Sequence, residues 1–206
     1  TITNYPEGQS ETFQVENNPN DPAAGTRSVT FSRHLYVEEE DFMEQPIPKY
    51  KRLYPEGPEC RLKGAYLITC TGCVKDESGR VVEILATYDP DSSGGNPADG
   101  RKVKGATIHW VDASTAVDAQ VRLYDNLFAD ENPDGGDKDF LDCLNPGSLE
   151  VLEGCKLEAS LAAAQPADRF QFLRLGYFCA DSKDSKPGAL VFNRAVSLKD
   201  GFKPGK

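Results

Sequence analysis

Residues 60–88 read CRLKGAYLITCTGCVKDESGRVVEILATY and carry the clearest structural signal in the chain. Residues 60–70 and 80–88 are rich in β-branched and aliphatic side chains, which favour strands. The polar run 75–79 between them ends in glycine and is typical of a turn. Two strands joined by a short polar loop form a β-hairpin, so this part of the chain predicts antiparallel β-structure.

Similar patterns extend in both directions from this hairpin. Alternating or β-branched stretches predict strands at 29–37, 102–111, 120–128, 148–157, 169–180 and 190–198. Short helical turns are expected at 38–43 and at 160–164, where Ser160 is a suitable N-cap. Residues 4–27 are rich in Asn, Pro, Gly and Glu, and they predict a weakly structured lead-in.

These elements predict an all-β protein, because no long segment keeps the 3.6-residue period of a helix. We expect two small β-barrels with short helices and long polar loops, since a sheet that closes on itself leaves no exposed edge. A change of pattern near residue 115 separates the two. The first barrel is assigned to residues 1–115, completed by the returning strand at 187–206, and the second to residues 116–186.

The composition limits the functional classes. The chain has 206 residues and a formal net charge of −10, and an acidic protein does not coat nucleic acid indiscriminately. The composition excludes collagen, coiled coil and a fully disordered chain. No stretch approaches the roughly 18 apolar residues of a membrane-spanning helix. The chain begins at Thr1 without an initiator methionine, so we expect a piece of a longer protein.

The sequence predicts no catalytic residue and no metal site. His34 and His109 both lie in strand patterns, where a single histidine is more often a packed or surface residue. Cys70 and Cys73 form a single Cys-x-x-Cys pair, whereas structural zinc needs four ligands. The six cysteines, in a chain without a secretion signal, favour reduced thiols and an intracellular protein.

A cluster of basic residues stands out against this acidic background. Residues 49–63 carry a local net charge of +3 in a chain of −10, so the remainder carries −13. Arginine offers a planar fork of donors to guanine or phosphate, and the interleaved tyrosines can stack on unpaired bases. The period of a strand places Arg61 and Lys63 on one face. The candidate RNA-binding residues are Lys49, Lys51, Arg52, Arg61 and Lys63; the alternative is a solvated basic surface.

Several blocks then carry a family resemblance. They are YKRL at 50–53, RLKGAY at 61–66, DGRKVKG at 99–105 followed by IHWV at 108–111, FQF at 170–172 with GYFC at 176–179, and VFNR at 191–194. In this order, and over almost the whole chain, they resemble the C-terminal anticodon-binding region of the glutaminyl-tRNA synthetases. The resemblance implies a proximal and a distal anticodon-binding β-barrel.

The resemblance also implies a function. Members of the family are class I glutamine–tRNA ligases, and this region binds the anticodon loop of glutamine tRNA. The family's His-Ile-Gly-His-like motif and Met-Ser-Lys loop do not occur in this chain, so the catalytic domain of the same polypeptide would attach glutamine. We expect no cofactor here, ATP and Mg²⁺ for the full-length enzyme, no membrane contact, a monomer and a cytoplasmic location.

Residue roles follow from the matching motifs. The resemblance implies that Arg52 reads the third anticodon base, a guanine, with Lys49 and Lys51 beside it. Lys49 stands where the family has glutamine. Arg61 and Lys63 match the pair near the wobble base, and Lys63 replaces an arginine of some members, so a phosphate or single-acceptor contact is expected there.

Two further residues match contacts to the middle base, a uracil. These are Gln171 and Arg174. In a plain strand they would point to opposite faces, so their cooperation requires strand twist or a bulge before Gly176.

Three alternatives stay open. The first is the anticodon-binding region of an archaeal or eukaryotic-type glutamyl-tRNA synthetase, which the DGRKVKG-to-HW block disfavours. The second is a β-barrel protein resembling the ribosomal 5S-RNA binders. The third is a β-barrel interaction module whose basic run is only surface.

Overall fold

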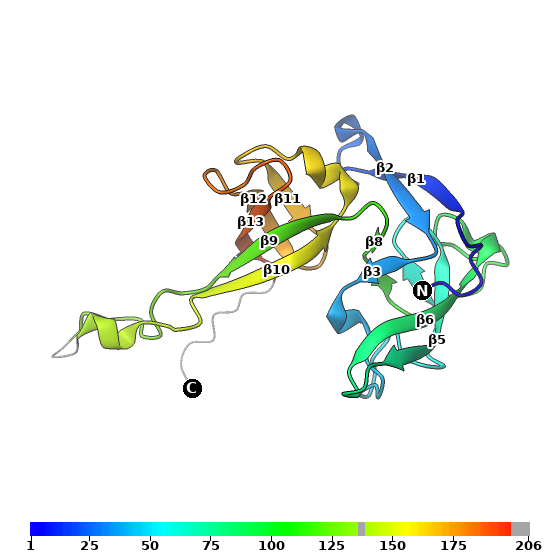
Figure 1. The fold of residues 1–206 in the computed structure, drawn as a ribbon, viewed down its shortest axis with the longest axis horizontal. Helices are drawn as coiled ribbons and strands as arrows, with labels where there is room; N and C mark the ends of the chain where they lie inside the picture. The colour runs from blue at the N-terminus through cyan, green and yellow to red at the C-terminus, as the bar shows by residue number, and fades with distance from the viewer. Residues whose placement is uncertain (136–138, 199–206) are drawn as a thin grey trace. The chain divides into compact units, whose positions relative to one another are not determined.

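The computed structural model describes residues 1–135 and 139–198 (Figure 1). The chain divides into two compact parts. Unit 1 comprises Thr1–Ala116 and Glu158–Ser160, and unit 2 comprises Val117–Leu157 and Leu161–Lys206. Every regular element in the described ranges is a strand or a short 3₁₀-helix, which confirms the all-β prediction. Among the same residues, we find no helix with the length and hydrophobicity that crossing a membrane requires.

Unit 1 is built from three separate β-sheets, or ladders of paired strands. Their strand orders are β1-β2, β3-β8 and β6-β5-β4-β7. The hairpin predicted from residues 60–88 is present as the antiparallel pair β5-β6. The single strand expected at 60–70 is instead divided into β4 and β5, and β5 continues to Lys75. The bounds are β1 Ser10–Glu16, β2 Thr26–Ser32, β3 Leu35–Val37, β4 Cys60–Leu62, β5 Leu67–Lys75, β6 Val81–Asp89, β7 Thr107–Ile108 and β8 Trp110–Asp112.

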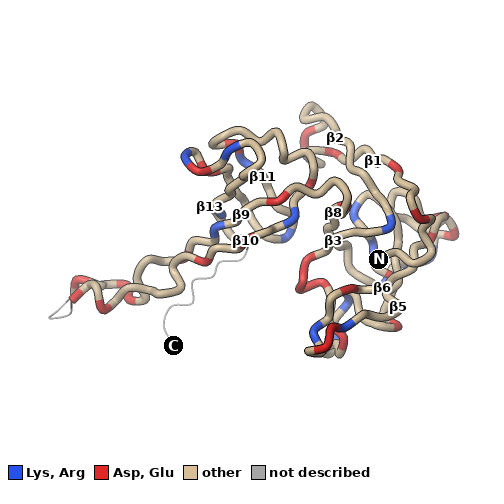
Figure 2. The backbone as a smooth tube through the Cα atoms, viewed as in Figure 1, with Lys and Arg blue, Asp and Glu red and all other residues tan. Residues whose placement is uncertain are grey.

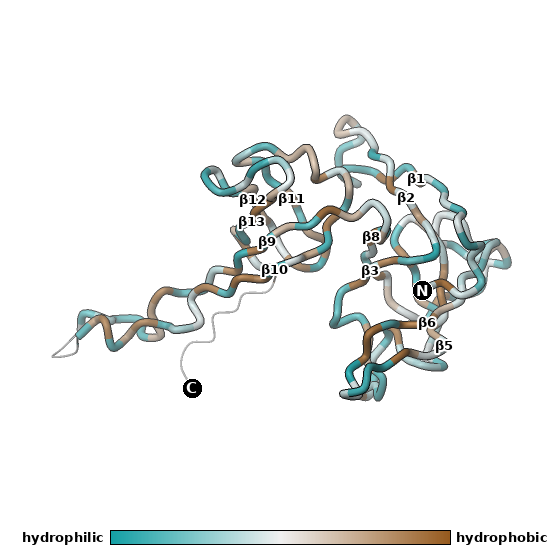
Figure 3. The backbone as a smooth tube through the Cα atoms, in the orientation of Figure 1, coloured by the Kyte–Doolittle hydropathy of each residue, from teal (hydrophilic) through white to brown (hydrophobic). Residues whose placement is uncertain are grey.

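One core joins the three ladders of unit 1. Phe31 of β2 is fully buried, and its ring meets those of Tyr5, Phe13, Tyr66 and Trp110 edge-on at centroid distances of 5.1–6.0 Å. Such edge-to-face contacts add to the burial of apolar area. Because strands from every ladder contribute to this core, the unit is barrel-like, although the ladders do not close into a continuous sheet. Figure 3 shows the hydrophobic stretches mainly on strands and the hydrophilic ones mainly on connecting loops.

Unit 2 is a five-stranded sheet in the order β10-β9-β13-β12-β11. Only the pair β9-β13 is parallel. A long arm of chain between β9 and β10 projects from the sheet (Figure 1). The bounds are β9 Val117–Tyr124, β10 Leu149–Leu157, β11 Arg169–Phe172, β12 Gly176–Ala180 and β13 Leu190–Ser197.

The returning strand belongs to unit 2, which differs from its sequence-based assignment to the first barrel. β13 lies between β9 and β12. Its buried residues Leu190 and Phe192 pack with Val121 and Phe178 in the second core. The local pattern identifies a strand but not its partners, because pairing depends on residues far away in the sequence. Of the predicted segment 187–206, residues 199–206 lie outside the described ranges.

The prediction of a weakly structured lead-in at 4–27 is wrong for its central part. β1 pairs with β2 from Ser10↔Ser32 to Glu16↔Thr26. Phe13 and Val15 are half-buried against the core of unit 1. The other residues of β1 are polar, so two apolar side chains are the whole hydrophobic pattern of this strand. Its stability depends on pairing with β2, which the local sequence does not show.

Short 3₁₀-helices connect the strands. Two of them coincide with the helical turns expected at 38–43 and 160–164. Ser160 is not the N-cap of the second, because that helix begins at Ala159. The expected single strand at 29–37 is interrupted after Ser32, and that at 102–111 is reduced to its last residues in β7 and the start of β8. The strand expected at 169–180 is divided by a turn into β11 and β12, and the one expected at 120–128 ends at Tyr124. The bounds are η1 Pro22–Ala24, η2 Glu39–Asp41, η3 Pro90–Ser92, η4 Phe140–Cys143 and η5 Ala159–Ala163.

Asp181, which follows β12, makes unit 2 sensitive to acid. A hydrogen bond from Asn193, followed by those from the backbone N–H groups of Asp184 and Lys183, lowers the pKa of Asp181 to about 2. Its stabilising effect is present above the ordinary value of 3.8 and is lost as the pH falls toward 2. We expect Asp181→Asn to lower the free energy of unfolding by about 1–2 kcal/mol at neutral pH. Urea titrations should show this difference shrinking below pH 3.8, and a constant difference would contradict the assignment.

Candidate nucleic-acid interface

Arg52 is anchored to the helix η2. Its Nη1 donates a hydrogen bond to the carbonyl oxygen of Glu40 at 3.1 Å and lies 3.2 Å from Oδ1 of Asp41. The Asp41 side chain is fully buried, whereas 34% of the Arg52 side chain is exposed. A guanidinium that is held on one side and exposed on another loses little conformational freedom when it binds a ligand.

The backbone around Arg52 is held equally firmly. Leu53 is buried, and its N–H donates to the carbonyl of Asp41 at 2.9 Å while its own carbonyl accepts from Met43 at 3.0 Å. Tyr50 donates its hydroxyl to the same Glu40 carbonyl that Arg52 binds, at 2.8 Å. The anchor of Arg52 therefore belongs to a fixed turn.

The two lysines that flank Arg52 are exposed. Lys49 lies in a turn with φ 69°, in the left-handed region. The carbonyl of Lys51 accepts a hydrogen bond from the N–H of Ala106 at 2.7 Å, which fixes the backbone and leaves the side chain outside. Lysine offers a point charge and not the planar fork of an arginine, so these two exposed residues suit contacts with phosphate.

Arg61 lies on the outer side of β4, as the strand period predicts, whereas Lys63 lies in the turn that follows this strand. Cys60 and Leu62 are fully buried, Arg61 is half-buried and Lys63 is exposed. The Nε of Arg61 donates to the carbonyl of Gly95, and its Nη1 lies 3.5 Å from Oγ1 of Thr107.

The segment 105–108 brings these cations into one neighbourhood of unit 1. Ala106 donates its N–H to Lys51, and its carbonyl accepts from the N–H of Arg61 at 3.0 Å. Two residues farther along, Ile108 accepts from the N–H of Lys63 at 3.0 Å. Lys51, Arg61 and Lys63 therefore flank a single short strand, and Arg52 is adjacent to Lys51 in the chain.

Glycine is required where this strand begins. A Cβ atom added to Gly105 would lie 2.3 Å from the carbonyl oxygen of Glu59 and 2.7 Å from Sγ of Cys60. Both distances are far below van der Waals contact, so the close approach of the segment to β4 depends on the absence of a side chain.

Acidic residues neutralise part of the surrounding charge. Arg101 binds Glu59 and Asp89 at 2.6 Å and Asp99 at 2.9 Å. The hydrogen bond from the Arg101 guanidinium lowers the pKa of Asp89, and the one from the Arg101 backbone N–H lowers the pKa of Asp99. These ion pairs of Arg101 connect the loop between β6 and β7 to Glu59, the residue before β4. Figure 2 shows Lys and Arg interleaved with Asp and Glu around the units rather than gathered on one basic face.

Gln171 and Arg174 lie at one end of the sheet in unit 2. Gln171 is exposed on β11, and its register partner on β12 is Tyr177. Arg174 lies in the turn between these strands with φ 66°, so strand parity does not apply to it. The register shift of this region lies between Tyr177 and Phe178, after Gly176 rather than before it.

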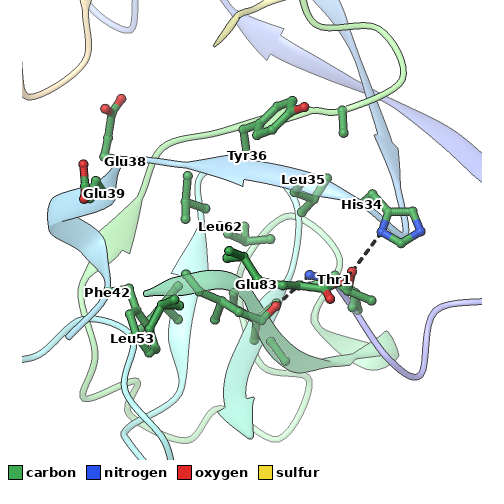
Figure 4. Close-up of a pocket in the computed structure, with 18 of the residues that line it drawn as sticks. Thr1, His34, Leu35, Tyr36, Glu38, Glu39, Phe42, Leu53, Leu62 and Glu83 are labelled. Atoms are coloured by element: carbon green, nitrogen blue, oxygen red, sulfur yellow. Dashed lines mark hydrogen bonds between the residues drawn. The ribbon is translucent and has the colours of Figure 1, made fainter. Parts of the chain in front are cut away.

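A cavity of about 720 Å³ lies elsewhere in unit 1 (Figure 4). It is lined largely by aliphatic side chains of β3 and β6, and the amino group of Thr1 donates to the carbonyl of Ile84 at 2.7 Å beside it. The hydroxyl of Thr1 lies 2.9 Å from Nδ1 of His34 and also contacts Glu83. None of the seven predicted RNA-binding residues lines this cavity. The candidate interface is therefore separate from this cavity.

Two family models match this chain. A model described as the anti-codon binding domain of class I tRNA synthetases (E and Q) matches residues 1–89. A second model with the same description matches residues 107–181. The two matches leave out residues 90–106 and 182–206, so they cover most of unit 1 and most of unit 2.

Curated relatives align with nearly the whole chain. A glutamine–tRNA ligase from Clostridium kluyveri is 54% identical over 203 residues, which are 98% of this chain and 36% of that protein. Glutamine–tRNA ligases from Pseudomonas putida and Clostridioides difficile are 54% and 50% identical, over 98% and 100% of this chain and 35% and 37% of their own. The chain thus spans little more than a third of the length of these relatives.

Proposed function

Because the chain belongs to the family of class I (E and Q) tRNA synthetase anticodon-binding domains, we propose that it binds the anticodon loop of glutamine tRNA. The observation that carries the proposal is the identity of 50–54% to glutamine–tRNA ligases along at least 98% of the chain. These alignments extend over both units of the chain. Glutamate-specific relatives are the nearest alternative, and the family description includes them.

The recognition mechanism rests on unpaired bases. An anticodon loop presents three bases whose pairing edges are free, and proteins read such bases by hydrogen bonds and by stacking. Arg52 is proposed to read the third base, a guanine, because a guanidinium fork matches the two acceptors of guanine. Its anchor on Glu40 and Asp41 supports this role, since it holds the fork in one orientation before RNA arrives.

The other site residues are proposed to contact different parts of the anticodon loop. Arg61, directed by Gly95 and Thr107, and the exposed Lys63 are proposed to act near the wobble base. Lys49 and Lys51 are proposed to contact phosphates, because a lysine provides a flexible point charge. Gln171 and Arg174 are proposed to bind the middle base, a uracil, from the end of unit 2.

The activity of the whole protein is also a proposal. A catalytic domain in the same polypeptide would join glutamine to its tRNA, with ATP and Mg²⁺ bound by that domain. We propose that this enzyme acts as a monomer in the cytoplasm. The six cysteines support a reducing compartment, since each is a free thiol in the structure.

A comparison of three RNAs tests the proposed function. The 206-residue chain is titrated with glutamine tRNA, with the same transcript carrying a different anticodon, and with a 5S ribosomal RNA. We expect binding to the first and a loss of at least tenfold in affinity for the second. Equal binding of all three would support a structural RNA-binding protein, and no binding would support an interaction module.

Lys102 and Lys104 provide a contrast within unit 1. Both are exposed and follow Arg101 closely in the chain, and we propose that they contact the RNA backbone. Replacing either with alanine should weaken cognate and anticodon-swapped tRNA by similar factors and lower the salt dependence of binding. Filter binding at several salt concentrations measures both quantities. A loss confined to the cognate anticodon would contradict the backbone role.

A further inference from the structure

We propose that Tyr177 is a base-stacking residue, whose ring packs on the unpaired base that Gln171 contacts by hydrogen bonding. The inference rests on the proposed function, and it adds a residue to the part of the interface formed by unit 2. The GYFC block at 176–179 does not by itself show which of its side chains faces solvent, so the sequence assigns Tyr177 no role.

The ladder of unit 2 places Tyr177 beside Gln171. Gln171 of β11 and Val196 of β13 are the register partners of Tyr177 on its two sides. Residues that face each other across antiparallel strands project from the same side of the sheet. Gln171, Tyr177 and Val196 therefore form one row on the solvent face at the end of the sheet where β11, β12 and β13 lie side by side (Figure 1).

The ring of Tyr177 is exposed although its neighbours in the chain are buried. The Tyr177 residue is 49% exposed, whereas Gly176 and Phe178 are buried. Val196, at 58% exposure, extends the apolar surface next to it. A nucleobase stacks through its face and forms hydrogen bonds through its edge. An exposed ring with an apolar residue on one neighbouring strand and a polar amide on the other offers both kinds of contact.

Positive charge on the same part of the sheet suits an RNA ligand. Arg169 is exposed and lies two residues before Gln171 on β11, so it shares the face of Gln171. Arg174 is exposed in the following turn. Guanidinium groups next to a stacking platform attract phosphate and can also stack on bases. This charge favours RNA over an apolar peptide as the occupant.

The support beneath Tyr177 is rigid. Gly176 has φ 155°, and a Cβ atom there would lie 2.4 Å from the carbonyl oxygen of Val196, so β12 and β13 approach each other closely at this rung. On the buried side, the rings of Phe172 and Phe178 stack with centroids 4.2 Å apart. The platform is therefore in place before RNA binds, which reduces the entropy lost on binding.

A double-mutant cycle between protein and RNA tests the inference. The 206-residue chain and its Tyr177→Ala variant are titrated with a glutamine anticodon stem-loop and with the same RNA lacking the middle base. We expect Tyr177→Ala to weaken the intact RNA roughly 10- to 100-fold, the range typical of one stacked base. The variant should bind the abasic RNA as well as the wild-type chain does. Tyr177→Phe keeps the ring and should stay within about twofold of wild type.

Tyr124 supplies a matched control, because it is a tyrosine of the same unit with 47% exposure on β9. Tyr124→Ala should show no coupling to the middle base. Equal losses of Tyr177→Ala on intact and abasic RNA, or no loss on either, would overturn the stacking role while leaving anticodon binding intact. A wild-type chain that binds both RNAs equally would overturn the proposed function together with the inference.

Discussion

Replacing Arg52 with lysine should lower the affinity for a glutamine anticodon stem-loop by about tenfold or more and abolish most of the preference for guanine at its third base. The reason is geometric: lysine keeps the positive charge but loses the planar fork that binds two acceptors of guanine. Such a contact is worth about 1–3 kcal/mol of discrimination against a wrong base. Filter binding with guanine and with adenine at that position measures the effect.

Lysine is a better test than alanine at this position. The carboxylate of Asp41 is completely buried next to Arg52, and removing its positive partner would destabilise unit 1 as well as the interface. Arg80→Lys, in the exposed turn between β5 and β6, is the matched control and should bind like wild type. An Arg52→Lys chain with an unchanged preference for guanine would remove Arg52 from its proposed role.

The largest effect on stability is expected for Phe31→Ala, with a loss of about 3–5 kcal/mol in the free energy of unfolding. Phe31 is fully buried and contacts four aromatic rings. Truncation removes these contacts and leaves a cavity where residues of all three ladders meet. Because unit 1 positions Arg52 and Arg61, the same variant should also lose RNA binding at temperatures where it unfolds.

Urea unfolding of the wild-type chain and two variants measures this prediction. Val82→Ala serves as the control, because Val82 is 60% exposed on β6 and its truncation should change the free energy by less than about 0.5 kcal/mol. Loss of less than about 1 kcal/mol in Phe31→Ala would show that the core of unit 1 tolerates a cavity at its centre, contrary to the tight packing described here.

The strands were predictable where the sequence pattern alone determines which side is buried. Residues 60–88 combine β-branched runs with a clear turn, and β5-β6 forms there. β1 was missed because Phe13 and Val15 are only half-buried on a ladder of two strands, so few apolar residues mark it. The place of β13 between β9 and β12 could not be predicted, because a partner some 70 residues away leaves no trace in the local pattern.

The sequence proposes the residues of the candidate site, and these stay a prediction, but it could not predict the contacts that hold them. Alternation along β4 correctly separates Arg61 from the buried Cys60 and Leu62, but Lys63 lies beyond the end of this strand, in a turn. The anchor of Arg52 on η2 and the contact of Arg61 with Gly95 are tertiary interactions that no spacing rule contains. Tyr177 illustrates the same limit, since its proposed stacking role follows only from the strand that lies beside it.

The central claim is that side chains of both units touch individual anticodon bases, and photocrosslinking tests it most directly. A glutamine anticodon stem-loop is prepared with 4-thiouracil as the middle base or 6-thioguanine as the third base, irradiated with the chain, and the linked peptides are identified by mass spectrometry. We predict that thioguanine links to the peptide that contains Arg52 and that thiouracil links to the peptide spanning Gln171 and Tyr177. Crosslinks from both bases at peptides outside these segments would contradict the account.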